Sequence, residues 1–206
     1  MSILIVGANG SMGRRYQAIL THTQTPFVGV DVDTPGDAVL DAAQRASGII
    51  IATPTNIHKR CLDVLSKWKV PILCEKPLTK DMDELLYIRD EIVRERKTNL
   101  TMVMQYEMLV KPGDDGGSYY DYFRHGNDGL NWDCMQIIGL AKGAIFLDEL
   151  SPVWKCAING RHIDFADMDG AYVSFIRRWL SAPGDDISRL FDIHLKVMEF
   201  KNGKGH

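Results

Sequence analysis

The sequence lacks the features of a membrane or secreted protein. No apolar run approaches the roughly 20 residues that a membrane-spanning helix needs. No basic stretch with a cleavage site precedes the first strand-like segment, so we expect no signal peptide. The 4 cysteines, Cys61, Cys74, Cys134 and Cys156, form no C-x-x-C pair and are expected to be buried thiols in a reducing compartment rather than disulfides or zinc ligands. These absences predict a cytoplasmic protein without a metal site.

The sequence also lacks an excess of basic residues. A net charge of −3 offers no general attraction to nucleic acid or to anionic membranes, and we expect neither as a partner. Apolar residues make up 45% of the chain and charged residues 25%, as in an ordinary globular protein with a core. A chain of 206 residues forms one large domain, or one full domain with a small companion.

The first stretch, Ser2 to Tyr16, predicts a strand, a glycine turn and a helix. Ile3 to Val6 is a continuous apolar run, as in strands that are buried on both faces. Gly7, Gly10 and Gly13 follow as G-x-x-G-x-x-G, one residue looser than the usual dinucleotide-binding G-x-G-x-x-G. Such a turn aims backbone N–H groups and the positive end of a helix at one point, where a pyrophosphate binds. A glycine-rich turn without a ligand is the alternative.

An acidic residue closes the second expected strand, Pro26 to Asp33. Asp31 lies 18 residues after Gly13, near the offset of about 20 residues at which a carboxylate meets the adenosine ribose of a dinucleotide. No lysine or arginine occurs from Asp31 to Gln44, so nothing there favours the 2′-phosphate of NADP. The pattern predicts NAD over NADP. A strand-end residue that turns into the following loop is the alternative for Asp31.

Strands and helices alternate over the first half of the chain. Further strands are expected at Gly48 to Ala52, Pro71 to Cys74 and Leu100 to Met104, with helices between them. Thr55 or Asn56 is expected to cap one of these helices. This alternation predicts an α/β fold with a doubly wound parallel sheet.

Several motifs of this half, taken together and in order, resemble one family. They are the glycine turn from Gly7 to Arg15, Asp31, Ala52-Thr53-Pro54-Thr55 with His58, and Cys74-Glu75-Lys76-Pro77-Leu78-Thr79. Over about its first 105 residues the sequence is similar to the Gfo/Idh/MocA oxidoreductases, the glucose–fructose oxidoreductase and inositol dehydrogenase family. The glutamate–lysine–proline tripeptide at a strand end, after T-P-T-x-x-H, is the most specific part. The resemblance implies a Rossmann-type domain that binds NAD.

The resemblance also implies roles for individual residues. The pyrophosphate of the cofactor would contact Gly7, Asn9, Gly10, Ser11 and Met12, and the adenosine ribose would contact Asp31. The middle of the cofactor would contact Thr53, Pro54, Thr55 and His58, and the nicotinamide would lie beside Glu75, Lys76 and Pro77. For His58, an ordinary structural role at the start of a helix is the alternative.

Lys76 is the expected catalytic residue. Hydride transfer from a carbinol to nicotinamide leaves a proton that some group must accept. A lysine near that hydroxyl binds the oxygen, polarises the product carbonyl or relays the proton. A surface lysine after a strand is the alternative, but Lys76 follows a parallel strand at its carboxyl end, where open α/β sheets bind ligands.

After Gln105 the family pattern thins out. We expect a Rossmann-type domain at residues 1–108 and a truncated α+β domain for substrate binding and oligomerisation at residues 109–206. Relatives carry an aspartate and a histidine, one helical turn apart, that face the nicotinamide, and Asp133 matches the acidic member. No histidine follows Asp133 at helical spacing, so a helix cap or an exposed acid is the alternative to a catalytic role.

Local patterns predict a few elements in the second half. Strands are expected at Ala144 to Leu147 and at Val153 to Ile158, and the second closes on Asn159-Gly160, a strong hairpin signal. Two helices with apolar stripes are expected, at Asp167 to Leu180 and around Ile187 to Met198. Because little sheet is visible to cover both stripes, we expect at least a dimer, with Trp179 or Phe191 near the contact.

Two functions are consistent with these patterns. The first is NAD-dependent transfer of a hydride between nicotinamide and a hydroxyl or keto group of a small sugar, polyol or sugar nucleotide. The second is a catalytically inactive dinucleotide-binding module that acts as a sensor or assembly partner. The retained Glu75-Lys76-Pro77 favours the enzyme, whereas the shortened second half and the incomplete catalytic pair favour the module.

Overall fold

The computed structural model describes residues 2–103 without a gap. In the second half it describes residues 145–147, 156–158, 161–163 and 165–184, together with Met108, Phe191, His194, Leu195 and Met198. The chain divides into two compact units, one made of Met1–Val103 with Trp179–Phe191 and the other of Met104–Arg178 with Asp192–His206. The expected domain bounds, 1–108 and 109–206, stay a prediction.

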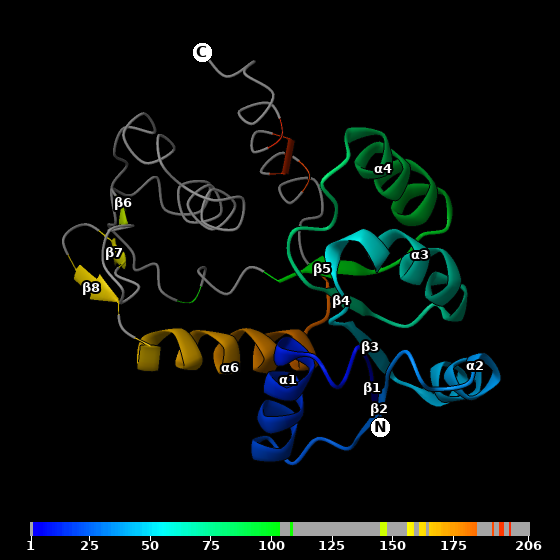
Figure 1. Cartoon of the computed structure of the whole chain (residues 1–206), viewed down its shortest axis with the longest axis horizontal. Helices are drawn as coiled ribbons and strands as arrows, with labels where there is room; N and C mark the ends of the chain where they lie inside the picture. Colours follow the sequence, from blue (N-terminus) through cyan, green and yellow to red (C-terminus); the bar gives the residue numbers. More distant parts are fainter. Residues whose placement is uncertain are drawn as a thin grey trace. The chain divides into compact units, whose positions relative to one another are not determined.

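The first unit is built on a five-stranded parallel sheet with the order β2-β1-β3-β4-β5 (Figure 1). Its strands are β1 (Ile3–Val6), β2 (Phe27–Val30), β3 (Gly48–Ile51), β4 (Ile72–Cys74) and β5 (Leu100–Met102). The central strand β3 is buried along its whole length, which explains its unbroken apolar run. The prediction of a doubly wound α/β sheet is confirmed.

The second strand ends three residues earlier than the sequence suggests, at Val30 rather than Asp33. Asp31 begins a turn instead, because the N–H of Thr34 donates to the carbonyl oxygen of Asp31 at 2.9 Å. The N–H of Asp31 in turn donates to the hydroxyl oxygen of Thr34 at 3.0 Å. Asp31 therefore leaves the sheet at the carboxyl end of β2.

Helices connect the parallel strands. They are α1 (Ser11–His22), α2 (Gly36–Arg45), α3 (Thr55–Leu65) and α4 (Met82–Tyr87), extended by the 3₁₀ turn η1 (Ser66–Trp68) after α3 and the π-helical η2 (Ile88–Glu95) after α4. Right-handed crossovers put α1 on one face of the sheet and α3 with α4 on the other (Figure 1). Within the described part of the chain, no helix combines the length and apolarity needed to cross a membrane.

The strand order reverses direction between β1 and β3. From β1 the chain moves to β2 on one side, and from β3 it moves through β4 to β5 on the other. Val6 pairs with both Val30 and Ile51, and Ile51 pairs with Cys74, so four strands end at the same level. The turns after β1, β2, β3 and β4 therefore share one edge, and such a switch point is where open α/β sheets bind ligands.

A charged cluster joins α3 to the helical segment after β4. Asp63 accepts hydrogen bonds from the Lys59 ammonium at 2.8 Å and from the Tyr87 hydroxyl at 2.7 Å, and the Arg96 guanidinium lies 3.3 Å away. Burial opposes ionisation of Asp63, but the hydrogen bonds from Lys59 and Tyr87 outweigh it and lower the pKa of the carboxyl. The cluster belongs to the scaffold, since Asp63 lies in the last turn of α3 and Tyr87 at the end of α4, away from the N-terminal turns of both helices.

The described part of the second unit contains an antiparallel sheet with the order β6-β7-β8. Its strands are β6 (Ile145–Leu147), β7 (Cys156–Ile158) and β8 (Arg161–Ile163). Ile158 pairs with Arg161 across Asn159-Gly160, which confirms the predicted hairpin. The helix α6 (Phe165–Ser181) confirms the predicted helix, and its stripe residues Tyr172, Phe175 and Ile176 are buried.

Two apolar side chains that were expected at a dimer contact are covered within the chain itself. Trp179 and Phe191 are each only 4% exposed. The Trp179 ring lies against the sheet, where a Cβ added to Gly48 would meet it at 3.0 Å. The expectation of an exposed stripe at these two residues is therefore wrong, and the oligomeric state stays a prediction.

Candidate functional site

The turn after β1 leads into the start of helix α1 at the carboxyl edge of the sheet. Gly7 has a φ of +88°, which favours glycine, and a Cβ there would meet the carbonyl oxygen of Ala52 at 2.8 Å. Helix α1 begins at Ser11 with Gly10 as its N-cap and without a side-chain cap. The first N–H groups of a helix have no partner within the helix, so this turn and helix start have the geometry of an anion site.

Gly13 lets the helix pack directly on this turn. It is buried in the first turn of α1, and a Cβ at Gly13 would lie 2.1 Å from the carbonyl oxygen of Gly7 and 2.7 Å from Cα of Ala8. Both neighbours are backbone, which cannot move aside as a flexible side chain can. The looser glycine spacing therefore still produces the close approach of helix and strand that the third glycine of a dinucleotide-binding turn provides.

The Asp31 carboxylate lies against the glycine turn. Its Oδ2 accepts the N–H of Asn9 at 2.6 Å, and its Oδ1 accepts the N–H of Val32 at 2.8 Å. An ionised carboxylate has about four acceptor sites, so two remain for the hydroxyl groups of a ligand. The structure thus brings Asp31 together with a turn 22 residues away in the sequence.

A second helix starts at the same edge after β3. Helix α3 begins at Thr55, with Pro54 as its N-cap and no side-chain cap. The expectation that Thr55 or Asn56 caps this helix is wrong, because both residues already lie inside its first turn. Thr53, Pro54 and Thr55 therefore form the approach to an uncapped helix N-terminus, next to the glycine turn.

His58 joins the turn after β3 to the turn after β4. The imidazole is fully buried; its Nε2 lies 2.8 Å from the carbonyl oxygen of Thr53, and its Nδ1 lies 3.0 Å and 3.2 Å from those of Pro77 and Leu78. Contacts with carbonyl oxygens favour the charged ring, but burial outweighs them and lowers the pKa of His58. His58 therefore holds two turns together within the chain, and a direct contact with a cofactor stays a prediction.

The segment of Glu75, Lys76 and Pro77 leaves the end of β4. The N–H of Glu75 donates to the carbonyl oxygen of Ile51 at 2.9 Å, which continues the sheet by one residue. The buried Glu75 carboxylate accepts hydrogen bonds from the Tyr16 hydroxyl and, at 3.1 Å, from the N–H of Lys76. Lys76 is half-buried, and the Lys76–Pro77 peptide bond is cis. Lys76 thus lies at the edge of the sheet that also carries Gly7 and Asp31.

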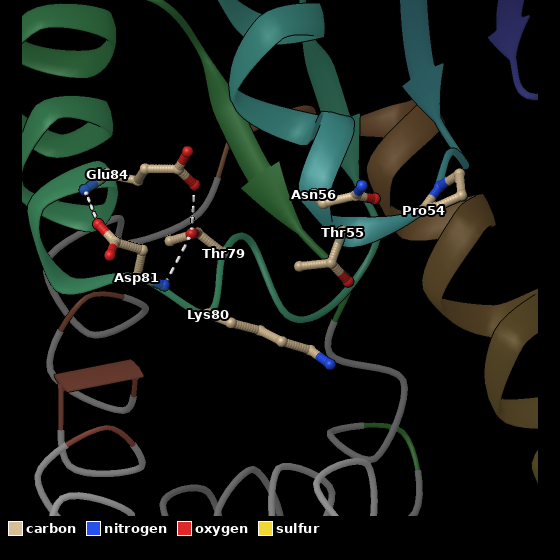
Figure 2. A pocket seen from close by; sticks show the side chains of 7 residues that line it. All are labelled: Pro54, Thr55, Asn56, Thr79, Lys80, Asp81 and Glu84. Carbon is tan, nitrogen blue, oxygen red and sulfur yellow. Dashed lines mark hydrogen bonds between the residues drawn. The ribbon is translucent and has the colours of Figure 1, made fainter.

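A pocket of about 710 Å³ opens between the start of α3 and the segment that leads into α4 (Figure 2). Its lining consists of Pro54, Thr55, Asn56, Thr79, Lys80, Asp81 and Glu84. One wall is held by a hydrogen-bonded chain, in which the N–H of Asp81 donates to the Thr79 hydroxyl at 3.0 Å and that hydroxyl donates to Glu84 at 2.6 Å. Figure 2 shows the Lys80 side chain extending below Thr55. The pocket therefore borders the residues predicted to contact the middle of a cofactor.

The second predicted catalytic residue, Asp133, lies outside the described residues, so its role stays a prediction. Cys61 and Cys74 are free thiols, and burial raises the pKa of both. Thiols of this kind are poor nucleophiles, because the reactive form is the thiolate. Among the described residues, no group of three or more histidine, cysteine or acidic side chains is arranged to hold a metal ion.

Two features of the site were not expected from the sequence. The first is the hydrogen bond from the Tyr16 hydroxyl to the Glu75 carboxylate. A tyrosine on a buried face is itself a signal, since a buried hydroxyl needs a hydrogen-bond partner. The second is the wall from Thr79 to Glu84, for which the capping-box spacing of Asp81 and Glu84 was an available signal.

Comparisons with known proteins agree with this geometry. No protein-family model matches the chain. Among curated proteins, the inositol 2-dehydrogenase of Renibacterium salmoninarum is 33% identical over 99 residues, and the match covers 39% of this chain and 30% of that protein. The chain therefore spans less than a third of the curated relative that it matches. Its sequence resemblance to the Gfo/Idh/MocA oxidoreductases is supported by this match.

Solved structures resemble the chain over nearly its whole length. The WlbA dehydrogenase from Thermus thermophilus, in complex with NAD and UDP-GlcNAcA, has a TM-score of 0.66 and 12% identity, covering 98% of this chain and 94% of that one. A myo-inositol dehydrogenase from Corynebacterium glutamicum has a TM-score of 0.62 and 14% identity, covering 99% and 95%. The chain has the fold of these dehydrogenases. The Rossmann-type fold class predicted from the sequence is thereby confirmed.

Proposed function

We propose that the protein is an NAD-dependent oxidoreductase, which transfers a hydride between nicotinamide and a hydroxyl or keto group of a small sugar, polyol or sugar nucleotide. One observation carries this proposal: the uncapped start of α1, the Asp31 carboxylate and Lys76 follow strands that end at one edge of the sheet. Structural neighbours crystallised with NAD, and a curated inositol dehydrogenase, support it.

The residues at this edge suit the parts of NAD. The glycine turn from Gly7 to Met12 would hold the pyrophosphate through the first N–H groups of α1, since the N–H of Asn9 already donates to Asp31, and the remaining acceptor sites of Asp31 would hold the adenosine ribose hydroxyls. A 2′-phosphate at Asp31 would meet a carboxylate, and no lysine or arginine occurs from Asp31 to Gln44 to offset it, so NAD is preferred to NADP. The middle of the cofactor would pass Thr53 to Thr55, toward Lys76 and Pro77.

Lys76 would act at the reacting oxygen of the substrate. NAD supplies the acceptor or donor of the hydride. The Nζ of Lys76 would donate a hydrogen bond to the substrate oxygen and, in the reductive direction, pass a proton to it. Burial of Glu75 beside Lys76 supports this role, because a fixed neighbour orients the peptide that carries the lysine.

Spectrophotometry of the nicotinamide tests this function directly. The protein is incubated with NADH and a panel of keto-sugars, and with NAD and a panel of polyols and sugar nucleotides. Replacement of Lys76 by methionine should lower kcat by about 10²- to 10⁴-fold, the usual worth of a positioned acid–base group, with NADH affinity nearly unchanged. The matched control is Lys67→Met, which removes an exposed lysine from the turn before β4.

One outcome would overturn the proposed activity, and another would overturn the role of Lys76. A wild-type protein that binds NADH firmly and turns over none of the substrates would indicate the inactive binding module instead. An active wild type whose Lys76→Met variant keeps full activity would remove Lys76 from the mechanism.

The location and assembly of the protein are part of the same proposal. A cytoplasmic location fits the free thiols of Cys61 and Cys74, which a reducing compartment preserves. A homo-oligomer is expected from the resemblance to enzymes that associate through their second half. Light scattering at tens of micromolar tests it, and a strict monomer would contradict it.

A further inference from the structure

Tyr16 makes a buried connection between the two halves of the candidate site. It lies on α1, one turn after Gly13, and is 0% exposed. Its hydroxyl donates to Oε1 of Glu75, which is 6% exposed and 59 residues away in the sequence. The other oxygen of the same carboxylate, Oε2, accepts the N–H of Lys76. A single carboxylate therefore joins the helix of the glycine turn to the peptide of the lysine.

Packing alone does not explain why residue 16 carries a buried hydroxyl. A phenylalanine would fill the same apolar space without the cost of burying a hydroxyl. A buried carboxylate, conversely, needs donors, and loss of one leaves it poorly solvated. The Tyr16 hydroxyl and the Lys76 N–H supply donors to both oxygens, so the carboxylate is held in one orientation.

We propose that Tyr16 is a positioning residue, which acts through Glu75 to fix Lys76 relative to the helix that binds the pyrophosphate. The inference rests on the proposed function for its catalytic meaning, but the positioning of Lys76 is a property of the chain alone. Tyr16 itself does not touch the substrate. If Tyr16 only ties α1 to the sheet, its hydroxyl affects stability and leaves Lys76 unchanged.

The test compares two tyrosine hydroxyls that each donate to a carboxylate. Tyr16→Phe removes the hydrogen bond to Glu75, and Tyr87→Phe removes the similar bond to Asp63, which lies in the scaffold. Acetic anhydride labels each lysine, and mass spectrometry measures the labelling rate of Lys76 relative to exposed Lys67 in the same sample. We expect Lys76 to label severalfold faster in Tyr16→Phe, because its peptide is less restrained, and at the wild-type rate in Tyr87→Phe.

Kinetics provide the second measurement. In Tyr16→Phe, kcat should fall by about tenfold to a hundredfold, the rate equivalent of a hydrogen bond to a charged group. The dissociation constant of NADH should change by less than about twofold, because the glycine turn and Asp31 remain intact. Tyr16→Phe in a Glu75→Leu background should have little further effect on kcat or on Lys76 labelling, since two residues that act through one contact are not additive.

The outcomes separate this inference from the proposed function. Labelling requires no turnover, so a wild type without activity contradicts the proposed function while the Lys76 labelling rate still decides the role of Tyr16. Equal Lys76 labelling in wild type and Tyr16→Phe, or equal acceleration in Tyr87→Phe, would overturn the inference. If Tyr16→Phe fails to fold, Glu75→Leu, which leaves no acceptor for the Tyr16 hydroxyl, tests the same link from the other side, and unchanged Lys76 labelling there would overturn the inference too.

Discussion

The turn after β1 and the turn after β4 lie at one edge of the sheet but are built in opposite ways. The first consists of backbone, with Asn9 and Gly10 exposed and a helix whose start has no side-chain cap. The second is braced by buried polar side chains, namely Glu75, Thr79 and His58. A turn whose backbone N–H groups contact a ligand needs small residues, because side chains would keep the ligand away from the backbone. A turn that presents one lysine needs neighbouring side chains that hold the lysine in place.

The largest effect should come from a side chain added to the first turn. Gly13→Ala places a Cβ 2.1 Å from the carbonyl oxygen of Gly7, so the helix must move away from the turn. We expect the free energy of unfolding to fall by about 3 kcal/mol or more, as in severe overpacking. Urea denaturation measures it.

The control for this change is Gly36→Ala in α2, where a Cβ would meet nothing within 4 Å. That variant should be unchanged, or more stable by up to about 1 kcal/mol, because alanine restricts the unfolded chain. Equal stability of the two variants would show that the first turn does not depend on the absence of a side chain.

A smaller effect should follow from Asp31, an acidic side chain that contacts the first turn. Asp31→Ser should reduce the preference for NAD over NADP by about 1–3 kcal/mol, the worth of a hydrogen bond to a charged group. Calorimetry of both cofactors measures it, with Asp33→Ser, an exposed acid two residues later, as the control. Equal or tighter NADP binding by the unmodified protein would contradict the assignment of Asp31.

The smallest effect should be a pH dependence of the free energy of unfolding that comes from His58, which holds the second turn in place. Burial lowers the pKa of His58 below its ordinary value of 6.5, so the unfolded chain binds the proton more readily than the folded one. The stability that this group contributes is complete above pH 6.5 and is lost as the pH falls through the lowered pKa.

A non-titrating replacement isolates this contribution. His58→Gln keeps an amide donor for one carbonyl oxygen but cannot take up a proton, so its stability should depend less steeply on pH below 6.5. Urea unfolding at several pH values measures the slope for wild type and variant. Identical slopes would show that His58 is not a titrating brace of this turn.

The predictable parts of the fold are those that local sequence controls. The run Ile3 to Val6 and the glycines after it predicted β1, its turn and α1. A strand that is buried on both faces needs a continuous apolar run, and a helix that packs closely on a turn needs glycine, so both leave a recognisable local sequence pattern. The predicted end of β2 was three residues too late, because Asp31 forms a turn with the Thr34 hydroxyl. Hydrophobic periodicity contains no information about such a side-chain hydrogen bond. Asp31 lies at the carboxyl edge of the sheet, and its contact with a cofactor stays a prediction.

The sequence by itself determined which residues reach the carboxyl edge of the sheet, because the patterns that predict strands and turns depend on residues that are close together in the sequence. Only the tertiary structure decided what those residues touch there. Tyr16 meets Glu75, His58 meets the carbonyl oxygens of Pro77 and Leu78, and Asp31 meets the N–H of Asn9, across separations of 59, 19, 20 and 22 residues. Hydrophobic periodicity predicts that a side chain is buried. The polar partner of a buried group depends instead on strand order and register, because these bring distant segments of the chain together.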